Sequence, residues 1–331
     1  MKIAIDAFGG DNAPLEIIKG TVMAKKEFDE EFILTGSIAG IKECAKQNGL
    51  SLDGIELVEA PQVMDMHDEA KLVVKGKADS SMGVGLRLVA DGKADAFVTA
   101  GPTGATLMGA TLLIKRLKGV RRPALGAVMP GVEGNFLLMD CGANVECLPE
   151  MLEQFGILGS IYMKKVYDIE NPKVGLANNG AEDSKGTEMH VQANKLLSQN
   201  PAINFVGNIE GRDVPFGKCQ VVVADGFSGN MILKVAEGSF GAVFTLLKGI
   251  FMKNLRTKIA ALLLKKSLYE IKEKYSQDAV GGAPFIGLNK PVIKAHGSSN
   301  ANAFKNAIAM AVKWHKSGVT EEIERTLNFS R

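Results

Sequence analysis

The stretch Val221–Ala236, with the sequence VVVADGFSGNMILKVA, decides the fold of this chain. Val221–Ala224 is a short apolar, β-branched run, which is typical of a buried strand. Asp225–Asn230 supplies two glycines for a turn, and Met231–Ala236 resumes the apolar pattern as the start of a helix. A strand that passes through a glycine turn into a helix directs backbone N–H groups and the positive end of the helix dipole at one place. That arrangement suits an anion.

The same order of strand, glycine-containing loop and helix recurs along the chain. Apolar runs predict strands over Lys2–Ala7, Glu31–Thr35, Ile55–Glu59, Ala96–Thr99, Leu125–Met129, Phe136–Asp140, Lys173–Ala177, Asn204–Gly207, Gln220–Ala224 and Pro291–Ala295. Helical patterns lie between them over Pro14–Glu27, Gly40–Asn48, Ser81–Asp91, Gly104–Leu117, Met151–Val166, Thr187–Ser198 and Ala301–Ser317. Most predicted strands are bare apolar runs, so we expect both faces of the sheet to be covered. The alternation predicts an open, mostly parallel α/β sheet.

Length and composition limit the classes of protein to which the chain can belong. Its 331 residues suffice for one large α/β unit or for two domains, and no repeat or low-complexity linker marks a boundary. We therefore expect 1–331 to form a single catalytic α/β unit, with two lobes as the alternative. The 39 Lys and Arg residues nearly balance 37 Asp and Glu residues, and only 6% of residues are aromatic. Both values argue against nucleic-acid binding.

The cysteines and histidines show no pattern that binds a metal. Cys44, Cys141, Cys147 and Cys219 form no C-x-x-C pair, and no H-x-x-x-H or carboxylate cluster has metal-ligand spacing. We therefore expect no metal, no cofactor and reduced thiols in a cytoplasmic protein. Met1–Asp6 already has the pattern of a strand, so we expect no cleavable signal. No run reaches the roughly 18 apolar residues of a membrane span.

A basic, apolar segment interrupts the alternation. Gly238–Tyr269 contains no acidic residue, and its lysines and arginines are interleaved with leucine, isoleucine and phenylalanine. The pattern predicts a helical protrusion over 238–275, with two arms. Two interpretations remain open. The segment is either a core helix with a solvated face, or an amphipathic helix pair that contacts an anionic membrane surface or an acidic partner.

Further loops place polar residues after predicted strands. They are Asp6–Pro14, Thr99–Ala105, Asp140–Asn144, Asn178–Gly186, Gly207–Asp213, Gly281–Pro284 and Ala295–Ser299. Lys185 either neutralises a phosphate or an oxyanion, or is a solvated surface lysine. Arg212 either binds phosphate or forms a structural ion pair with Glu210 or Asp213. His296, beside a Gly-Ser-Ser turn, is either a site residue or a structural histidine.

The chain shows no nucleophile of its own. It has no G-x-S-x-G elbow, no cysteine in an obvious activating setting and no Walker loop. An enzyme with these loops does not need such a group if its substrate supplies one. Phosphate does so, and the protein then has to hold it, align it and stabilise an oxyanion.

Six ordered blocks, taken together, resemble one known family. They are Ile5–Asp11, Lys77–Met82, Gly142–Asn144, Gly207–Asp213, Asp225–Asn230 and Gly281–Pro284. In these blocks the chain is similar to bacterial phosphate acyltransferase of the PlsX type, from Met1 to about Gly318. Two loops depart from the family pattern. Pro102 stands where the family usually has Asn, which removes an amide and a backbone donor, and Ala177–Ala181 differs from the family's Leu-Asn-Ile-Gly-Glu-Glu pattern.

The resemblance implies a reaction in which inorganic phosphate attacks the thioester of a fatty acyl-acyl carrier protein. The products are acyl phosphate and free carrier protein, for phospholipid biosynthesis. It also implies a three-layer α/β/α fold like those of isopropylmalate dehydrogenase and the phosphotransacetylases. A homodimer in the cytoplasm, peripherally associated with the inner face of the cell membrane, is implied as well.

The resemblance and the loops together give candidate site residues. Phosphate is expected at the Asp225–Asn230 turn, with Lys185 stabilising negative charge. The predicted catalytic residues are Lys185, Asn230, Ser228, Asp225 and His296. The predicted phosphate- or substrate-binding residues are Gly226, Gly229, Asn208, Arg212, Asn144, Gly9 and Gly10.

Two surfaces are predicted to contact partners. Because carrier protein is acidic, we expect it to dock on Lys118, Arg121 and Arg122, although a solvated helix end and loop is the alternative interpretation. Leu255, Leu262 and Leu263 are the predicted membrane contacts.

Other functions fit the same loops. The first is a nicotinamide-dependent dehydrogenase on a related fold, although no ribose-binding acid can be recognised. The second is a short-chain phosphotransacetylase that uses coenzyme A. The third is a non-catalytic sensor of acyl carrier protein, which turnover would distinguish.

Overall fold

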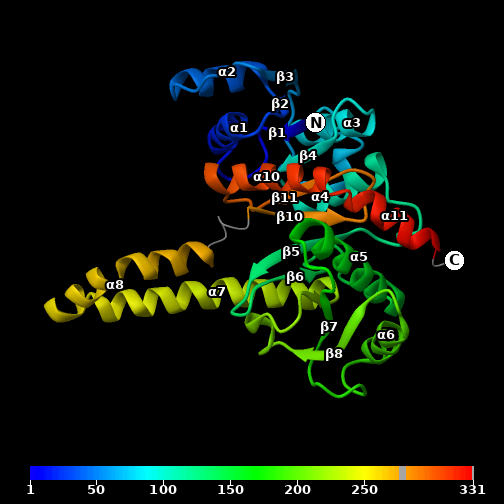
Figure 1. Ribbon diagram of the computed structural model, residues 1–331. Coiled ribbons are helices and arrows are strands. Elements are labelled where there is room, and N and C mark those ends of the chain that lie inside the picture. The colour runs from blue at the N-terminus through cyan, green and yellow to red at the C-terminus, as the bar shows by residue number, and fades with distance from the viewer. Residues whose placement is uncertain (276–280, 330–331) are drawn as a thin grey trace.

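Strands and helices alternate through the computed structural model, which describes residues 1–275 and 281–329 (Figure 1). The strands are β1 (Lys2–Asp6), β2 (Glu31–Gly36), β3 (Ile55–Glu59), β4 (Ala96–Thr99), β5 (Ala124–Pro130), β6 (Asn135–Met139), β7 (Lys173–Asn178), β8 (Asn204–Glu210), β9 (Val221–Val223), β10 (Gly282–Ile286) and β11 (Val292–Ala295). The α-helices are α1 (Leu15–Glu27), α2 (Ile38–Gln47), α3 (Ser81–Ala90), α4 (Thr103–Gly109), α5 (Pro149–Tyr167), α6 (Glu188–Gln199), α7 (Gly226–Phe251), α8 (Leu255–Lys274), α10 (Ala301–Ser317) and α11 (Val319–Phe329). Short helical turns are η1 (Ala70–Val73), η2 (Ala110–Ile114) and η3 (Val214–Phe216).

The described strands form one sheet in the order β3-β2-β1-β4-β11-β10-β5-β6-β9-β7-β8. The group β3, β2, β1, β4 and β11 is parallel, and so is the group β6, β9, β7 and β8. Between the groups, β10 is antiparallel to β11 and β5, and β5 is antiparallel to β6. The predicted mostly parallel sheet is therefore confirmed, and its antiparallel strands lie where the two groups meet.

Two apolar cores, one on each face of the sheet, explain the layers. Alternate residues of each strand enter opposite cores, as Ile3 and Ile5 do on one side and Ala4 on the other. The first core also contains the buried faces of α1, α5, α10 and α11. The second contains those of α3 and α4, with Leu233 of α7 packed against it. The fold therefore has three layers, α/β/α, as expected.

All ten predicted strands are present, but two elements were not predicted. Gly282–Ile286 was expected to be part of a loop and instead forms β10, which pairs with β11 from Gly282↔Ala295 to Pro284↔Ile293. Glycine and proline disfavour strands locally, and the pairing of this short hairpin overrides that preference. The helix α11 follows Gly318, which has φ +68° and ends α10 in the left-handed conformation.

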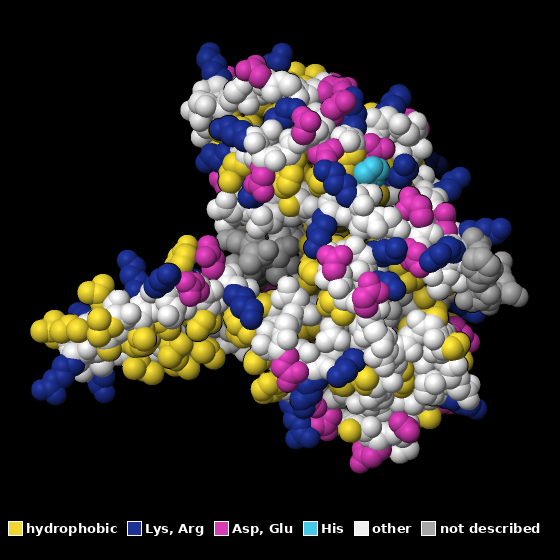
Figure 2. All heavy atoms as spheres, in the orientation of Figure 1, with side chains coloured by type: hydrophobic (Ala, Val, Ile, Leu, Met, Phe, Trp, Pro, Cys, Tyr) yellow, Lys and Arg dark blue, Asp and Glu magenta, His cyan; other side chains and the backbone are white. Residues whose placement is uncertain are grey.

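The predicted helical protrusion is a hairpin of α7 and α8 that projects from the body of the molecule (Figure 1). It begins earlier than expected, because α7 continues without a break from Gly226. No residue of α8 is buried, and apolar side chains cover much of the hairpin surface (Figure 2). By length and composition alone, α7 is long and apolar enough to cross a membrane. The expectation that no segment could span a membrane is therefore wrong by these two criteria.

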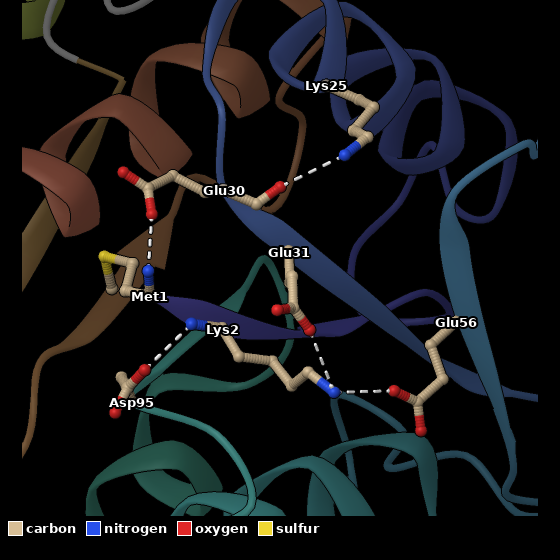
Figure 3. Close-up of polar contacts among 7 residues, drawn as sticks. All are labelled: Met1, Lys2, Lys25, Glu30, Glu31, Glu56 and Asp95. Atoms are coloured by element: carbon tan, nitrogen blue, oxygen red, sulfur yellow. Dashed lines mark hydrogen bonds and ion pairs between the residues drawn. The ribbon is translucent and has the colours of Figure 1, made fainter.

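Charged contacts fix the amino ends of the first strands, at the edge opposite the loops (Figure 3). The Met1 ammonium lies 2.7 Å from a carboxylate oxygen of Glu30, and the Lys2 backbone N–H donates to Asp95 at 2.8 Å. The Lys2 side chain bridges Glu31 at 3.2 Å and Glu56 at 2.9 Å. These pairs join β1 to β2 and β3 and leave the opposite strand ends to the candidate site.

The start of α7 depends on a close backbone approach at Gly229. A Cβ atom there would overlap the carbonyl oxygen of Asp140, whereas nothing lies within 4 Å of a Cβ at Gly238 in the same helix. We expect Gly229→Ala to lower the free energy of unfolding by about 1–3 kcal/mol or more, as overpacking does. Gly238→Ala should instead raise it by about 0.5–1 kcal/mol, because alanine favours a helix. Urea unfolding followed by circular dichroism measures both, and equal effects would contradict this account of the α7 anchor.

Candidate active site

A cleft of about 1150 Å³ lies between the loops after β1, β4, β6 and β11 and the helix α7. Near the start of α7 its lining is polar and includes Asp11, Asn230, Lys234, Lys294 and His296. Further along, where α7, α8 and β5 form the walls, the lining is mainly apolar and includes Met129, Phe240, Phe244, Leu268 and, just after α8, Tyr275. Lys248, Lys265 and Lys272 also contribute to this second part. The cleft therefore suits a ligand with a charged head and an apolar tail.

The buried carboxylate of Asp6 organises one wall of the cleft. It accepts a hydrogen bond from Thr99 Oγ1 at 2.7 Å, and the same Thr99 oxygen accepts from the Gly101 N–H at 2.8 Å. Burial raises the pKa of Asp6, while hydrogen bonds such as that from Thr99 act in the other direction. The ends of β1 and β4 are thereby joined at the cleft.

The predicted glycines of the first loop serve a close approach of backbones. Gly10 has φ +102°, and a Cβ there would lie 2.8 Å from the Gly297 carbonyl oxygen. The Asp11 N–H donates to that same oxygen at 2.8 Å, and the Asn12 amide donates to Ser298 O at 2.9 Å. Gly10 therefore lets Asp11 and the His296 loop come together, whereas Gly9 lies against Asp6 and Gly101, where a Cβ would overlap the Asp6 carboxylate and lie 2.8 Å from the Gly101 nitrogen.

Asp140 plays the corresponding role after β6. Its buried carboxylate accepts hydrogen bonds from the backbone N–H groups of Leu125 at 3.0 Å, Ala143 at 3.0 Å and Asn144 at 2.6 Å. Burial raises its pKa, against the effect of these hydrogen bonds. The Asn144 amide donates to Asp140 and to the Pro123 carbonyl, both at 2.9 Å, so it is committed to holding the loop.

The turn that opens α7 has fewer free donors than the sequence suggested. The carboxylate of Asp225 caps the helix by accepting from the Ser228 N–H at 2.9 Å, and the Gly226 N–H donates to Asn144 O at 2.7 Å. The Gly229 N–H also donates to Asp225 O at 2.8 Å, so three of the backbone amides expected to hold phosphate are already engaged. Asn230, one turn further into α7, lines the cleft with an exposed side chain.

Lys185 lies in a neighbouring loop and not among the residues that line the cleft. Gly186 of this loop lies against His190 of α6, and the His190 Nε2 lies 3.9 Å from Asp225 Oδ2, so the loop approaches the start of α7 only through His190. Lys185 itself is exposed. Asn208 is buried and supports the loop by donating to Glu182 O at 2.8 Å.

Arg212 lies apart from these groups. Its side chain is 81% exposed and pairs with Glu210, which is the structural alternative weighed for it. The neighbouring Asp213 pairs with Lys218 at 2.6 Å. The structural ion pair is therefore present, and a phosphate contact of Arg212 stays a prediction.

His296 lines the cleft with a ring whose state its neighbours define. Ser298 N–H donates to Nδ1 at 3.3 Å, and Ser298 Oγ lies 2.8 Å from the same nitrogen. Nδ1 is thus an acceptor, and the neutral ring carries its proton on Nε2. Burial and the charge of Lys234 lower the pKa of His296, which favours this neutral form at pH 7.

Lys294 is a cleft residue that the sequence reasoning missed, since it lies within an apolar strand, β11. Its Nζ donates to the Ala100 carbonyl at 3.3 Å and to that of Ala295. Lys234 and Asp11 were also not singled out. The sequence did contain one signal for Lys294: it is the only charged residue in the apolar run Pro291–Ala295, and it lies two residues before His296.

Three of the four cysteines, Cys141, Cys147 and Cys219, are poor nucleophiles. Cys141 lines the cleft, but burial, with Asp140, raises its pKa above the usual range. Burial raises the pKa of Cys147 to about 12 and that of Cys219 to about 11. All three are therefore thiols near neutral pH.

The predicted contact surfaces lie outside the cleft. Lys118, Arg121 and Arg122 are exposed around the loop between η2 and β5. Leu255, Leu262 and Leu263 of α8 are 75%, 70% and 81% exposed. Neither set contributes a side chain to the cleft lining.

Comparison with known proteins identifies the family. A family model described as fatty acid synthesis protein matches residues 1–322. A relative from Alkaliphilus oremlandii, named phosphate acyltransferase, is 46% identical over 98% of this chain and 96% of its own length. One of the same name from Clostridium botulinum is 44% identical over 98% of both chains.

Solved structures support the fold alone, because their identities are low. A phosphotransacetylase from Streptococcus pyogenes has a TM-score of 0.65 at 20% identity and covers 96% of this chain and 94% of its own. A 4-hydroxythreonine-4-phosphate dehydrogenase from Klebsiella pneumoniae has a TM-score of 0.53 at 10% identity, covering 94% of this chain and 97% of its own. The expected likeness to phosphotransacetylase and dehydrogenase folds is confirmed. With the family model and the named relatives, it follows that the chain belongs to the phosphate acyltransferase family of the PlsX type and is an enzyme that transfers acyl groups.

Proposed function

We propose that this enzyme transfers the fatty acyl group of acyl-acyl carrier protein to inorganic phosphate, and that the acyl phosphate serves phospholipid biosynthesis. The observation that carries this proposal is the two-part cleft. Its polar part suits a phosphate and a thioester carbonyl, and its apolar part, which runs along α7 and α8, suits a long alkyl chain. Family membership supports the phosphate and acyl parts of the proposal.

The reaction needs no covalent intermediate on the protein. A phosphate oxygen attacks the thioester carbonyl carbon and forms a C–O bond, which gives a tetrahedral oxyanion. Collapse breaks the C–S bond, and the carrier's thiolate leaves and takes a proton from solvent. The raised pKa values of the cysteines fit a mechanism in which the substrate supplies the nucleophile.

Lys185 and Asn230 are the proposed catalytic residues. The Asn230 amide, on the cleft wall, donates a hydrogen bond to phosphate or to the oxyanion. Lys185, in the loop that lies against His190 beside Asp225, offsets the negative charge. Ser228 Oγ and His296 Nε2 are further donors, whereas Asp225, Gly226, Gly229 and Asn144 hold the turn in place.

Two alternatives are less well supported. A short-chain phosphotransacetylase that uses coenzyme A would leave the apolar part of the cleft without a ligand. A nicotinamide-dependent dehydrogenase shares the fold only, and relatives spanning nearly the whole chain are named phosphate acyltransferases.

Partners follow from the same proposal. The acidic carrier protein docks on Lys118, Arg121 and Arg122 by charge complementarity. The exposed leucines of α8, interleaved with lysines, contact an anionic membrane surface. We propose a homodimer in the cytoplasm that associates peripherally with the inner face of the membrane.

The catalytic assignment predicts a loss of turnover without a loss of folding. Lys185→Ala and Asn230→Ala should each lower kcat by about 10²-fold or more, as removing one oxyanion donor does. The assay incubates palmitoyl-acyl carrier protein with phosphate and measures free carrier and acyl phosphate. Lys195→Ala, at an exposed lysine of α6, is the control and should retain full activity. Near-normal turnover by both test variants would rule out the assignment.

The docking surface predicts a change in carrier affinity. Arg121→Glu with Arg122→Glu should raise the KM for acyl-acyl carrier protein roughly tenfold and leave the KM for phosphate unchanged, because only the charge that attracts the carrier is reversed. The effect should fall at high salt. Lys42→Glu, an exposed charge reversal on α2, serves as the control. An unchanged KM for the carrier substrate would count against docking here.

The membrane surface predicts binding to anionic vesicles that salt weakens. Leu262→Glu should reduce flotation with phosphatidylglycerol vesicles about tenfold or more, since burying a leucine contributes about 1.5–3 kcal/mol. Val206→Glu places the same charge at an exposed apolar residue of β8 and should float like wild type. Equal flotation of Leu262→Glu and wild type would remove the proposal.

A further inference from the structure

Lys294 occupies an unusual position for a lysine. It lies near the end of β11, between Thr99 of β4 and Ala283 of β10 in the sheet register. Its strand neighbours Ile293 and Ala295 are fully buried. The side chain is only partly exposed, and it lines the polar part of the cleft.

The ammonium of Lys294 has only neutral partners at hydrogen-bond distance. It donates to the carbonyl oxygens of Ala100 and Ala295. Among residues 1–275 and 281–329, no carboxylate forms an ion pair with it within 4.0 Å. An ammonium has three donors, so these two carbonyls leave one for a ligand.

The charges around Lys294 come from three elements. Asp6 of β1 and Asp11 of the following loop favour its protonated form, while Lys234 of α7 disfavours it. Burial is the largest effect and lowers the pKa of Lys294 to about 8. The group is therefore a partly desolvated cation at pH 7, and a second lysine in the same cleft, Lys234, pairs with Glu237 at 2.9 Å.

A dianion would complete this arrangement. Phosphate accepts hydrogen bonds on several oxygens, and a desolvated ammonium interacts with it more strongly than a solvated one does. The Nε2–H of His296 and the amide of Asn230 are further donors in the same lining. The bonds of Lys294 to the Ala100 and Ala295 carbonyls do not account for the further donors, His296 and Asn230, that line the same part of the cleft.

We propose that Lys294 is a further catalytic residue, whose ammonium contacts the phosphoryl oxygens of inorganic phosphate and of the acyl phosphate product. The proposal rests on the function proposed above and assigns the phosphate to the cleft between β11 and α7. Lys185, in its exposed loop, remains the other lysine proposed to offset the negative charge. The lysine positions the attacking oxygen and offsets its charge and takes no part in proton transfer.

Direct binding tests the proposal without turnover. Inorganic phosphate should raise the Tm of the wild-type protein, with sulfate as a probe of the same shape and chloride as the ionic-strength control. Lys294→Met should abolish this shift, whereas Lys290→Met, in the turn that precedes β11 and outside the cleft lining, should retain it. The proposal would be overturned if Lys294→Met kept the phosphate-induced Tm shift, or if phosphate did not raise the Tm of the wild-type protein.

Steady-state kinetics separate a phosphate contact from a structural role. In Lys294→Met the KM for phosphate should rise about tenfold to a hundredfold, and the KM for palmitoyl-acyl carrier protein should change less than about twofold. A structural role would instead change both, or lower the Tm alone. If wild type forms no acyl phosphate, the proposed function fails, and the phosphate-induced Tm shift still decides the role of Lys294.

The pH dependence of kcat/KM for phosphate on the alkaline side, its alkaline limb, gives a third measurement. It can be made even if Lys294→Met does not fold. Lys294 is charged below a pKa of about 8, so kcat/KM for phosphate should fall as pH rises through that value. Burial, Asp11, Asp6 and Lys234 set that pKa, and Glu237 and His296 are the other titratable groups in the same part of the cleft. Lys294→Arg keeps its charge, so its limb should move to higher pH while activity below pH 8 is at least partly retained. An arginine variant with the wild-type limb would overturn the proposal.

Discussion

Two buried carboxylates, Asp6 and Asp140, hold the candidate site together. Each lies where a strand ends, and each is satisfied by hydrogen bonds from the loops that follow it or lie beside it. A buried carboxylate without such partners would be costly, so these loops have little freedom to rearrange. The walls of the cleft are therefore fixed before any ligand binds, which lowers the entropy that binding must overcome.

Most of the fold could be predicted from the sequence, because its signals are local. Strands such as Val221–Val223 are bare apolar runs, and the glycine turns between strands and helices mark the boundaries. The strand Gly282–Ile286 could not be predicted in this way, since its pairing with β11 and β5 comes from distant parts of the chain. In this segment the local preference of glycine and proline disfavours a strand, but pairing with the neighbouring strands outweighs that preference.

The candidate site was less predictable, because it depends on which side chains face one space. Asn230 and His296 were expected and line the cleft, whereas Arg212 follows a similar loop and pairs with Glu210 at the surface. Nothing in the local sequence separates these cases. Lys294 was not predicted because a lysine within an apolar strand belongs to no motif. Its candidate role became visible only from the positions of Ala100, Asp11 and Lys234 around it.

The helix α7 connects the polar part of the cleft to the tip of the α7–α8 hairpin. It runs for 26 residues from the cleft to the tip of the hairpin, a length of about 39 Å at 1.5 Å per residue. Gly226 and Gly229 bury its first turn against the body, and nothing comparable holds its far half. Because α7 is one continuous helix, a displacement of the hairpin tip would be carried along its backbone. It would shift Asn230 and Lys234, which lie near its buried first turn.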